Sequence, residues 1–63
     1  MMKLSLGDMV FVRDSLFISP TKPLIIIDIY KIEISSYHYF VVVDPSTGEK
    51  FTYQEHNLSE VPL

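Results

Sequence analysis

The chain has 63 residues, a formal net charge of −3, 48% hydrophobic residues and no cysteine. A chain of this length forms one domain, which we place over residues 1–63, and such a domain buries only about 60% of the surface that its unfolded chain exposes. The absence of cysteine excludes disulfide bonds and thiolate metal sites, so packing or self-association must stabilise the fold. The apolar content excludes a disordered chain.

Positive charge is scarce, because the chain has only five lysines and arginines and no run of like charge. Nucleic-acid binding draws much of its affinity from clustered cations, so the composition argues against a nucleic-acid partner. The first residues, "MMKLSLGDMV", lack the apolar core of a signal peptide. We therefore expect the protein in the cytoplasm.

The stretch "LGDMVFVRD" opens with a turn signal, Gly-Asp, and continues as an alternating strand from about Met9 to Arg13. Val10 and Val12 share one face, which we expect to point inward. Phe11 then points outward, together with Met9. The next stretch, "SLFISPTKP", contains two prolines and small polar residues, and it predicts a long loop.

Residues 23–34, "PLIIIDIYKIEI", contain six isoleucines but also Asp28, Lys31 and Glu33. A membrane-spanning helix needs about 20 predominantly apolar residues, so this run is excluded as a span, and we expect no membrane contact. Isoleucine is β-branched and packs better on a pleated sheet than in a helix. The run therefore predicts a strand.

The alternation of this strand changes parity along its length. Two sets of isoleucines fall on opposite parities, Ile25, Ile27 and Ile29 in the first and Ile32 and Ile34 in the second. A one-residue slip exchanges the two faces of a strand. A bulge or sharp bend near Tyr30 and Lys31 would return both sets to the same interior, so that one long strand serves two sheets.

The segment "SSYHYFVVVD" predicts a third strand from about Tyr37 to Val43, after a short turn at residues 35–36. The following "DPSTG" is the strongest turn signal of the chain. Asp44 can accept backbone N–H bonds, Pro45 presets the backbone for the turn, and Gly48 can take the left-handed conformation. We expect a four-residue hairpin loop here.

The rest of the chain predicts two more strands. "EKFTY" alternates as a fourth strand, "QEHN" fits a single 3₁₀ turn, and "LSEVPL" is typical of a short last strand. Pro62 places this strand at an edge or at the end of the chain. The pattern is thus an all-β chain with five short strands, a long first loop and a bent second strand.

Two segments resemble known proteins. "GDMVFV" resembles the Gly-Asp-x-Val-x-Val opening of SH3-like, KOW-like and Tudor-like barrels, and "YQEHNLSEV" is similar to the closing segment of small bacteriophage-encoded barrels of this kind. The resemblance implies a small five-stranded SH3-like barrel with a single 3₁₀ turn before the last strand. It also implies a phage accessory protein, located in the host cytoplasm.

The residue patterns of catalysis are missing from this sequence. No serine lies in a glycine-flanked elbow, and His38 and His56 show none of the spacings typical of zinc ligands. The acidic residues are dispersed among predicted turns and strand exteriors, where they usually face solvent. We therefore expect no enzyme activity, no catalytic residue, no metal, no cofactor and no small-molecule substrate.

Aromatic residues beyond the needs of the core are the one functional signal. One alternating set of the third strand must face away from the core, either Tyr37, Tyr39 and Val41 or His38, Phe40 and Val42. We take Phe11, Phe17, Tyr37 and Tyr39 as a candidate interaction surface, because aromatic residues are enriched at protein interfaces. The alternative is that these rings only close the open ends of a small barrel.

Two functions remain open. The first is a non-catalytic protein-interaction or self-associating module, whose partner is another protein chain or a second copy of itself. The second is a nucleic-acid-binding barrel of the KOW or Tudor type, in which the aromatic residues would stack on bases. Recognition of proline-rich peptides is less favoured, because the aromatic groove of signalling SH3 domains uses a tryptophan and this chain has none.

Overall fold

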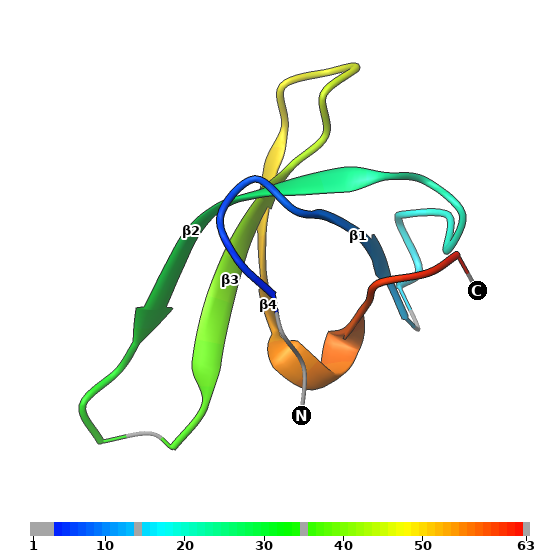
Figure 1. Cartoon of the computed structure of the whole chain (residues 1–63). Helices are drawn as coiled ribbons and strands as arrows, with labels where there is room; N and C mark the ends of the chain where they lie inside the picture. Colours follow the sequence, from blue (N-terminus) through cyan, green and yellow to red (C-terminus); the bar gives the residue numbers. More distant parts are fainter. Residues whose placement is uncertain (1–3, 14, 35, 63) are drawn as a thin grey trace.

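Alternating apolar residues and short turns build one antiparallel sheet in the computed structural model, which describes residues 4–13, 15–34 and 36–62 (Figure 1). The described residues form five strands and one 3₁₀ turn, in the order β1 (Met9–Val12), β2 (Leu24–Lys31), β3 (His38–Val43), β4 (Lys50–Gln54), η1 (Glu55–Asn57) and β5 (Leu58–Ser59). The prediction of an all-β fold with five strands and a 3₁₀ turn before the last strand is confirmed. Nowhere in these ranges is there a helix long and apolar enough to cross a membrane.

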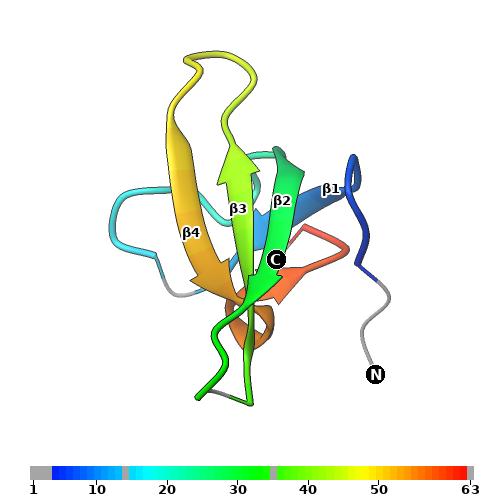
Figure 2. The ribbon, with the colours of Figure 1, turned by 90° about the vertical axis from the view of Figure 1, so that its left-hand side faces the viewer.

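The strands follow the order β4-β3-β2-β1-β5, so β4 and β5 are the two edges of the sheet. The first residues of β2 pair with β1, whereas β3 pairs along nearly the whole of β2. Figure 1 shows β2 bending across the fold between these two neighbours, and Figure 2 shows β2, β3 and β4 side by side. The edges β4 and β5 do not pair with each other in the described residues, so the expected barrel is an open, curved sheet.

A tight turn positions the start of β1. The N–H of Asp8 donates to the carbonyl of Ser5 at 3.1 Å, which closes a four-residue turn over residues 5–8. Gly7, the third residue of this turn, takes a φ of +88°, a conformation that glycine adopts without steric cost. Gly7 and Asp8 then exchange hydrogen bonds with Ile26, at 2.8 Å and 3.0 Å. The predicted Gly-Asp turn is confirmed, and it extends the pairing of β1 with β2 by one residue.

The bulge in β2 lies at Ile27, three residues before the predicted bend. The register of β2 against β3 shifts between Ile26 and Asp28, so Ile27 is the extra residue. Leu24 and Ile26 are buried before the bulge, and Ile29 packs against the core after it. The inward and outward faces of β2 are therefore exchanged at Ile27. The prediction of a bend near residues 30–31 is wrong.

The predicted interior face of the isoleucine run is also wrong, except at Ile29, which packs against the core. Ile27, Ile32 and Ile34 are exposed, and Ile25 is only half-buried. The reason is that residues 24–27 are continuously apolar, so no polar residue marks which parity faces inward. Contact with β1 and β3 selects Leu24 and Ile26 instead.

The core lies between the curved sheet and the loop that joins β1 to β2. Its buried members come from all strands except β4 and from that loop: Val10, Val12, Ile18, Leu24, Ile26, Phe40, Val42 and Leu58. The inward prediction for Val10 and Val12 is confirmed, and Met9 is exposed as expected. On β3 the residues Phe40 and Val42 face the core, which resolves the choice between its two alternating sets.

Phe11 is buried, with only 7% of its surface exposed, so the prediction that it points outward into solvent is wrong. It pairs with Ser59 of β5 and lies outside the main core cluster. Alternation along β1 correctly separates Phe11 from Val10 and Val12. It cannot show that the second face of a strand is covered as well, because that depends on segments far away in the sequence.

Candidate interaction surface

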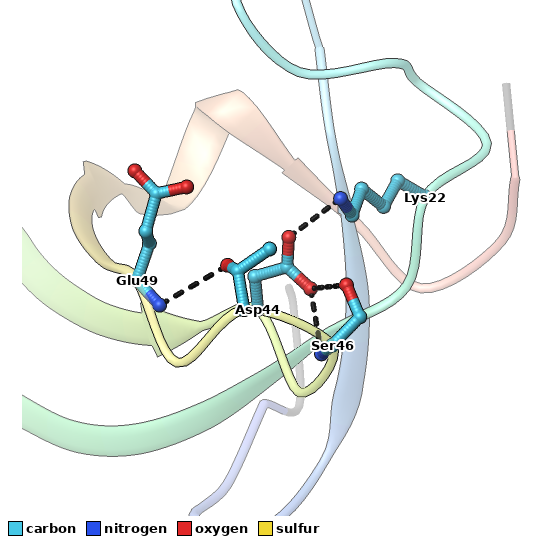
Figure 3. Close-up of polar contacts among 5 residues, drawn as sticks. Lys22, Asp44, Ser46 and Glu49 are labelled. Carbon is cyan, nitrogen blue, oxygen red and sulfur yellow. Dashed lines mark hydrogen bonds and ion pairs between the residues drawn. The ribbon is translucent and has the colours of Figure 1, made fainter.

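Asp44, at the start of the turn between β3 and β4, forms several polar contacts with other described residues. Its Oδ1 accepts hydrogen bonds from the backbone N–H of Ser46 at 2.9 Å and from the Ser46 hydroxyl at 2.7 Å. Its Oδ2 forms an ion pair with Nζ of Lys22 at 2.5 Å, which ties the loop between β1 and β2 to this turn (Figure 3). Each carboxylate oxygen therefore has its own partner.

The backbone of the same turn matches the prediction from "DPSTG". The carbonyl of Asp44 accepts from Thr47 at 3.2 Å and from Gly48 at 2.7 Å, and its N–H donates to the carbonyl of Glu49 at 2.8 Å. Gly48 takes a φ of +80°. A four-residue loop, residues 45–48, thus closes the hairpin, and this prediction is confirmed.

Lys22 and Ser46 determine the charge state of Asp44. The hydrogen bond from Lys22, followed by those from Ser46, holds the pKa of the Asp44 carboxyl well below its ordinary value. Asp44 therefore stays ionised and bonded across the physiological range, which suits a structural role. The same contact partly neutralises Lys22, which leaves one cation fewer for a phosphate partner.

The described residues offer little else for chemistry. They contain no group of three or more histidine and carboxylate residues placed to hold a metal ion. They also contain no pocket in which a small ligand could be enclosed. What the molecule does offer is exposed apolar surface.

Several exposed apolar side chains lie on the β2–β3 hairpin, which projects from the sheet at the end opposite the β3–β4 turn (Figures 1 and 2). We define the hairpin surface as Tyr30, Ile32, Ile34, Tyr37 and Tyr39. Ile34 is 97% exposed and Tyr37 is 56% exposed, while Tyr39 is half-buried. Scattered apolar residues are normal on protein surfaces, but several on one projecting element indicate an interaction site.

Ring contacts hold the base of the hairpin surface in place. Tyr30 and Tyr39 are cross-strand neighbours, and their rings stack with centroids 5.5 Å apart and an angle of 21°. The amide of Gln54 donates to the Tyr39 hydroxyl at 3.4 Å, and the Tyr37 ring meets the His56 ring edge-on at 6.5 Å. Rings fixed in this way lose little conformational entropy when a partner binds.

Only two of the four predicted surface residues come together. Tyr37 and Tyr39 both belong to the hairpin surface, whereas Phe11 is buried within the chain. Phe17 is 92% exposed, but it lies in the loop between β1 and β2, which Figure 1 shows on the other side of the molecule from the hairpin. Its neighbour Leu16 is exposed as well, so this loop carries a second apolar patch.

The prediction from sequence missed Ile32 and Ile34, which it placed in the interior. Both follow Lys31, the last residue of β2, and therefore have no neighbouring strand to cover them. The serines at positions 35 and 36 were the available signal, because polar turn residues so close by leave little room for a buried strand end.

Comparisons of the chain with protein-family models, with curated proteins and with solved structures find no match. Function must therefore be inferred from the chain's own surface.

Proposed function

We propose that the chain is a non-catalytic protein-interaction module and that the hairpin surface binds another protein. The observation that carries this proposal is the exposure of Ile34, with Ile32 and Tyr37 beside it in sequence on a projecting hairpin. Leaving such side chains in water forgoes roughly 1.5–3 kcal/mol each relative to full burial. A partner that covers them recovers this free energy.

We also infer that the fold is a member of the SH3-like class. Support comes from the long loop between β1 and β2, from β2 shared between β1 and β3, and from η1 directly before β5. Modules of this size commonly serve as binding units whose specificity lies in loops and surface residues. The inferred class is therefore compatible with the proposed role.

The test compares the hairpin surface with the loop patch as a matched control. The double variant Ile32→Ser, Ile34→Ser removes apolar surface from the hairpin. Leu16→Ser, Phe17→Ser removes two apolar side chains from the loop between β1 and β2, and both of these are more than 90% exposed. Partners would be captured from source cells with the original chain, purified, and titrated against all three proteins by calorimetry. We expect the hairpin variant to weaken binding by about tenfold or more and the loop variant to leave it nearly unchanged.

Two outcomes would contradict the proposal. One is equal binding by the original chain and the hairpin variant. The other is micromolar binding of DNA or RNA oligonucleotides at physiological salt in place of a protein partner, which would favour the nucleic-acid function. Circular dichroism of each variant would show that the fold is retained.

A further inference from the structure

The free edge of β4 can be assigned residue by residue. Asp44 and Glu49 form the hydrogen-bonded pair that closes the β3–β4 hairpin, so every second pair after it is also hydrogen-bonded. Phe51 and Tyr53 therefore direct their backbone groups toward β3. Lys50, Thr52 and Gln54 direct theirs away from the sheet. Gln54 is the N-cap of η1, where its carbonyl accepts the first bond of the 3₁₀ turn, whereas Lys50 and Thr52 bond to no other described backbone group on this side.

The other open edges of the sheet are protected. The part of β2 that does not pair with β1 carries the bulge at Ile27. There the outward N–H of Ile29 donates a hydrogen bond to the carboxylate of Asp28 at 2.9 Å. The edge strand β5 has only two residues, and Ser59 turns the chain through hydrogen bonds to both backbone groups of Val61. Bulges, charged side chains and short strands are the usual devices against edge-to-edge pairing.

In contrast, β4 is a regular strand with little protection. All five of its residues pair with β3 without a register shift, so no bulge interrupts its outer edge. No side chain in the described residues caps its outward N–H groups at Lys50, Thr52 or Gln54. Lys50 is its one charged residue. Such an edge is a template for an added strand.

The sequence of β4 is complementary to itself. We propose that two copies of this chain pair through their β4 strands, antiparallel, about a twofold axis at Thr52. In this register Thr52 faces Thr52 of the second copy, and Lys50 faces the neutral Gln54. Phe51 of each copy faces Tyr53 of the other copy, which makes two cross-strand aromatic pairs of a kind that stabilises sheets.

The ends of this pairing also fit a second copy. Glu49 and Glu55 would face each other if the strands ran further, and their like charges would repel. The chain turns away at both residues, into the β3–β4 turn and into η1, so the pairing ends where the repulsion would begin. The resulting ten-stranded sheet uses a surface different from the hairpin surface, and the proposal does not depend on the function proposed above.

The first test removes a single outward N–H. Thr52→Pro deletes a donor that the isolated chain does not use, and proline is tolerated on an edge strand where its N–H would face solvent. Sedimentation equilibrium should show a dimer for the original chain and a dimer constant weakened by at least about tenfold for Thr52→Pro, because two intermolecular hydrogen bonds are lost. Leu16→Pro, in the exposed loop between β1 and β2, is the matched control, because the N–H of Leu16 has no hydrogen-bond partner among the described residues, and this variant should still dimerise.

The second test keeps the backbone intact and checks the twofold axis. Thr52→Lys and Thr52→Glu each place like charges opposite each other, so each alone should dimerise about fivefold more weakly than the original chain. Mixing the two variants places lysine opposite glutamate and should restore the dimer. Only a register that sets residue 52 against itself produces this rescue.

Each possible result bears on the proposal. A chain that stays monomeric at high concentration overturns it, and so does a dimer that the Thr52 variants leave intact. If Ile32→Ser, Ile34→Ser abolishes the dimer while Thr52→Pro does not, the copies meet through the hairpin surface instead. A monomer whose binding to another protein is lost in Thr52→Pro would mean that β4 accepts a strand from a different chain.

Discussion

The two hairpins that share β3 differ in how closely local sequence controls them. The β3–β4 hairpin is closed by Asp44, Ser46 and Gly48 through hydrogen bonds between residues at most five positions apart. The β2–β3 hairpin contains a bulge, and its tip carries exposed isoleucines. The first hairpin is thus stabilised by local hydrogen bonds, whereas the second leaves apolar side chains exposed to solvent.

The largest expected difference in stability is between a substitution in the buried part of β2 and one in the exposed residues that follow it. Ile26→Ala removes a fully buried side chain opposite Val42 and should lower the free energy of unfolding by about 2–5 kcal/mol. Ile34→Ala removes a side chain that is in solvent already, so its effect should stay within about 0.5 kcal/mol. Urea denaturation followed by circular dichroism measures both, and equal losses would mean that the hairpin tip is packed.

The next effect tests the closed turn of the β3–β4 hairpin. Gly48→Val forces a β-branched residue to a φ of +80°, which should cost about 1–3 kcal/mol of stability. The cost is purely conformational, because an added Cβ would meet no atom within 4 Å. Ser46→Val, which loses one hydroxyl hydrogen bond to Asp44, should cost less.

Gly48→Asn is the control for the same position, since asparagine tolerates the left-handed region better than valine. Thermal denaturation of the three variants should rank Gly48→Val as the least stable. If Ser46→Val were less stable than Gly48→Val, the hydrogen bonds of the Asp44 carboxylate, and not the glycine, would be the main stabilising feature of the turn.

A smaller effect concerns the pH dependence of the same turn. Because the folded-state pKa of Asp44 lies below its ordinary value, its contribution to stability is complete above the unfolded-state pKa, about 3.9. That contribution is lost as the pH falls through the unfolded-state pKa toward the lower folded-state pKa. Solvent screening at the partly exposed Lys22 keeps the effect modest.

Urea midpoints measured at falling pH for the original chain and for Asp44→Asn would show this contribution. The loss of stability on acidification should be shallower in Asp44→Asn, which has no charge to lose at this position. Parallel curves for the two proteins would mean that other carboxylates account for the acid sensitivity.

Features controlled by neighbouring residues were predictable from the sequence. The turns at Gly7 and Gly48, the 3₁₀ turn after β4 and the inward face of Val10 and Val12 all depend on residues a few positions apart. Conformational preference and alternation act over that range. Tyr37, one of the predicted surface residues, lies on the exposed hairpin for the same reason.

Features that depend on distant segments were not predictable. The bulge lies at Ile27 because β1 and β3 together bury Leu24 and Ile26, and an uninterrupted apolar run is compatible with either parity. Phe11 is covered although its alternation places it opposite the core valines. Ile32 and Ile34 remain exposed because β2 ends before them and no strand among the described residues covers them. Short-range preferences specify strands and turns, but burial is set by which segments meet in space.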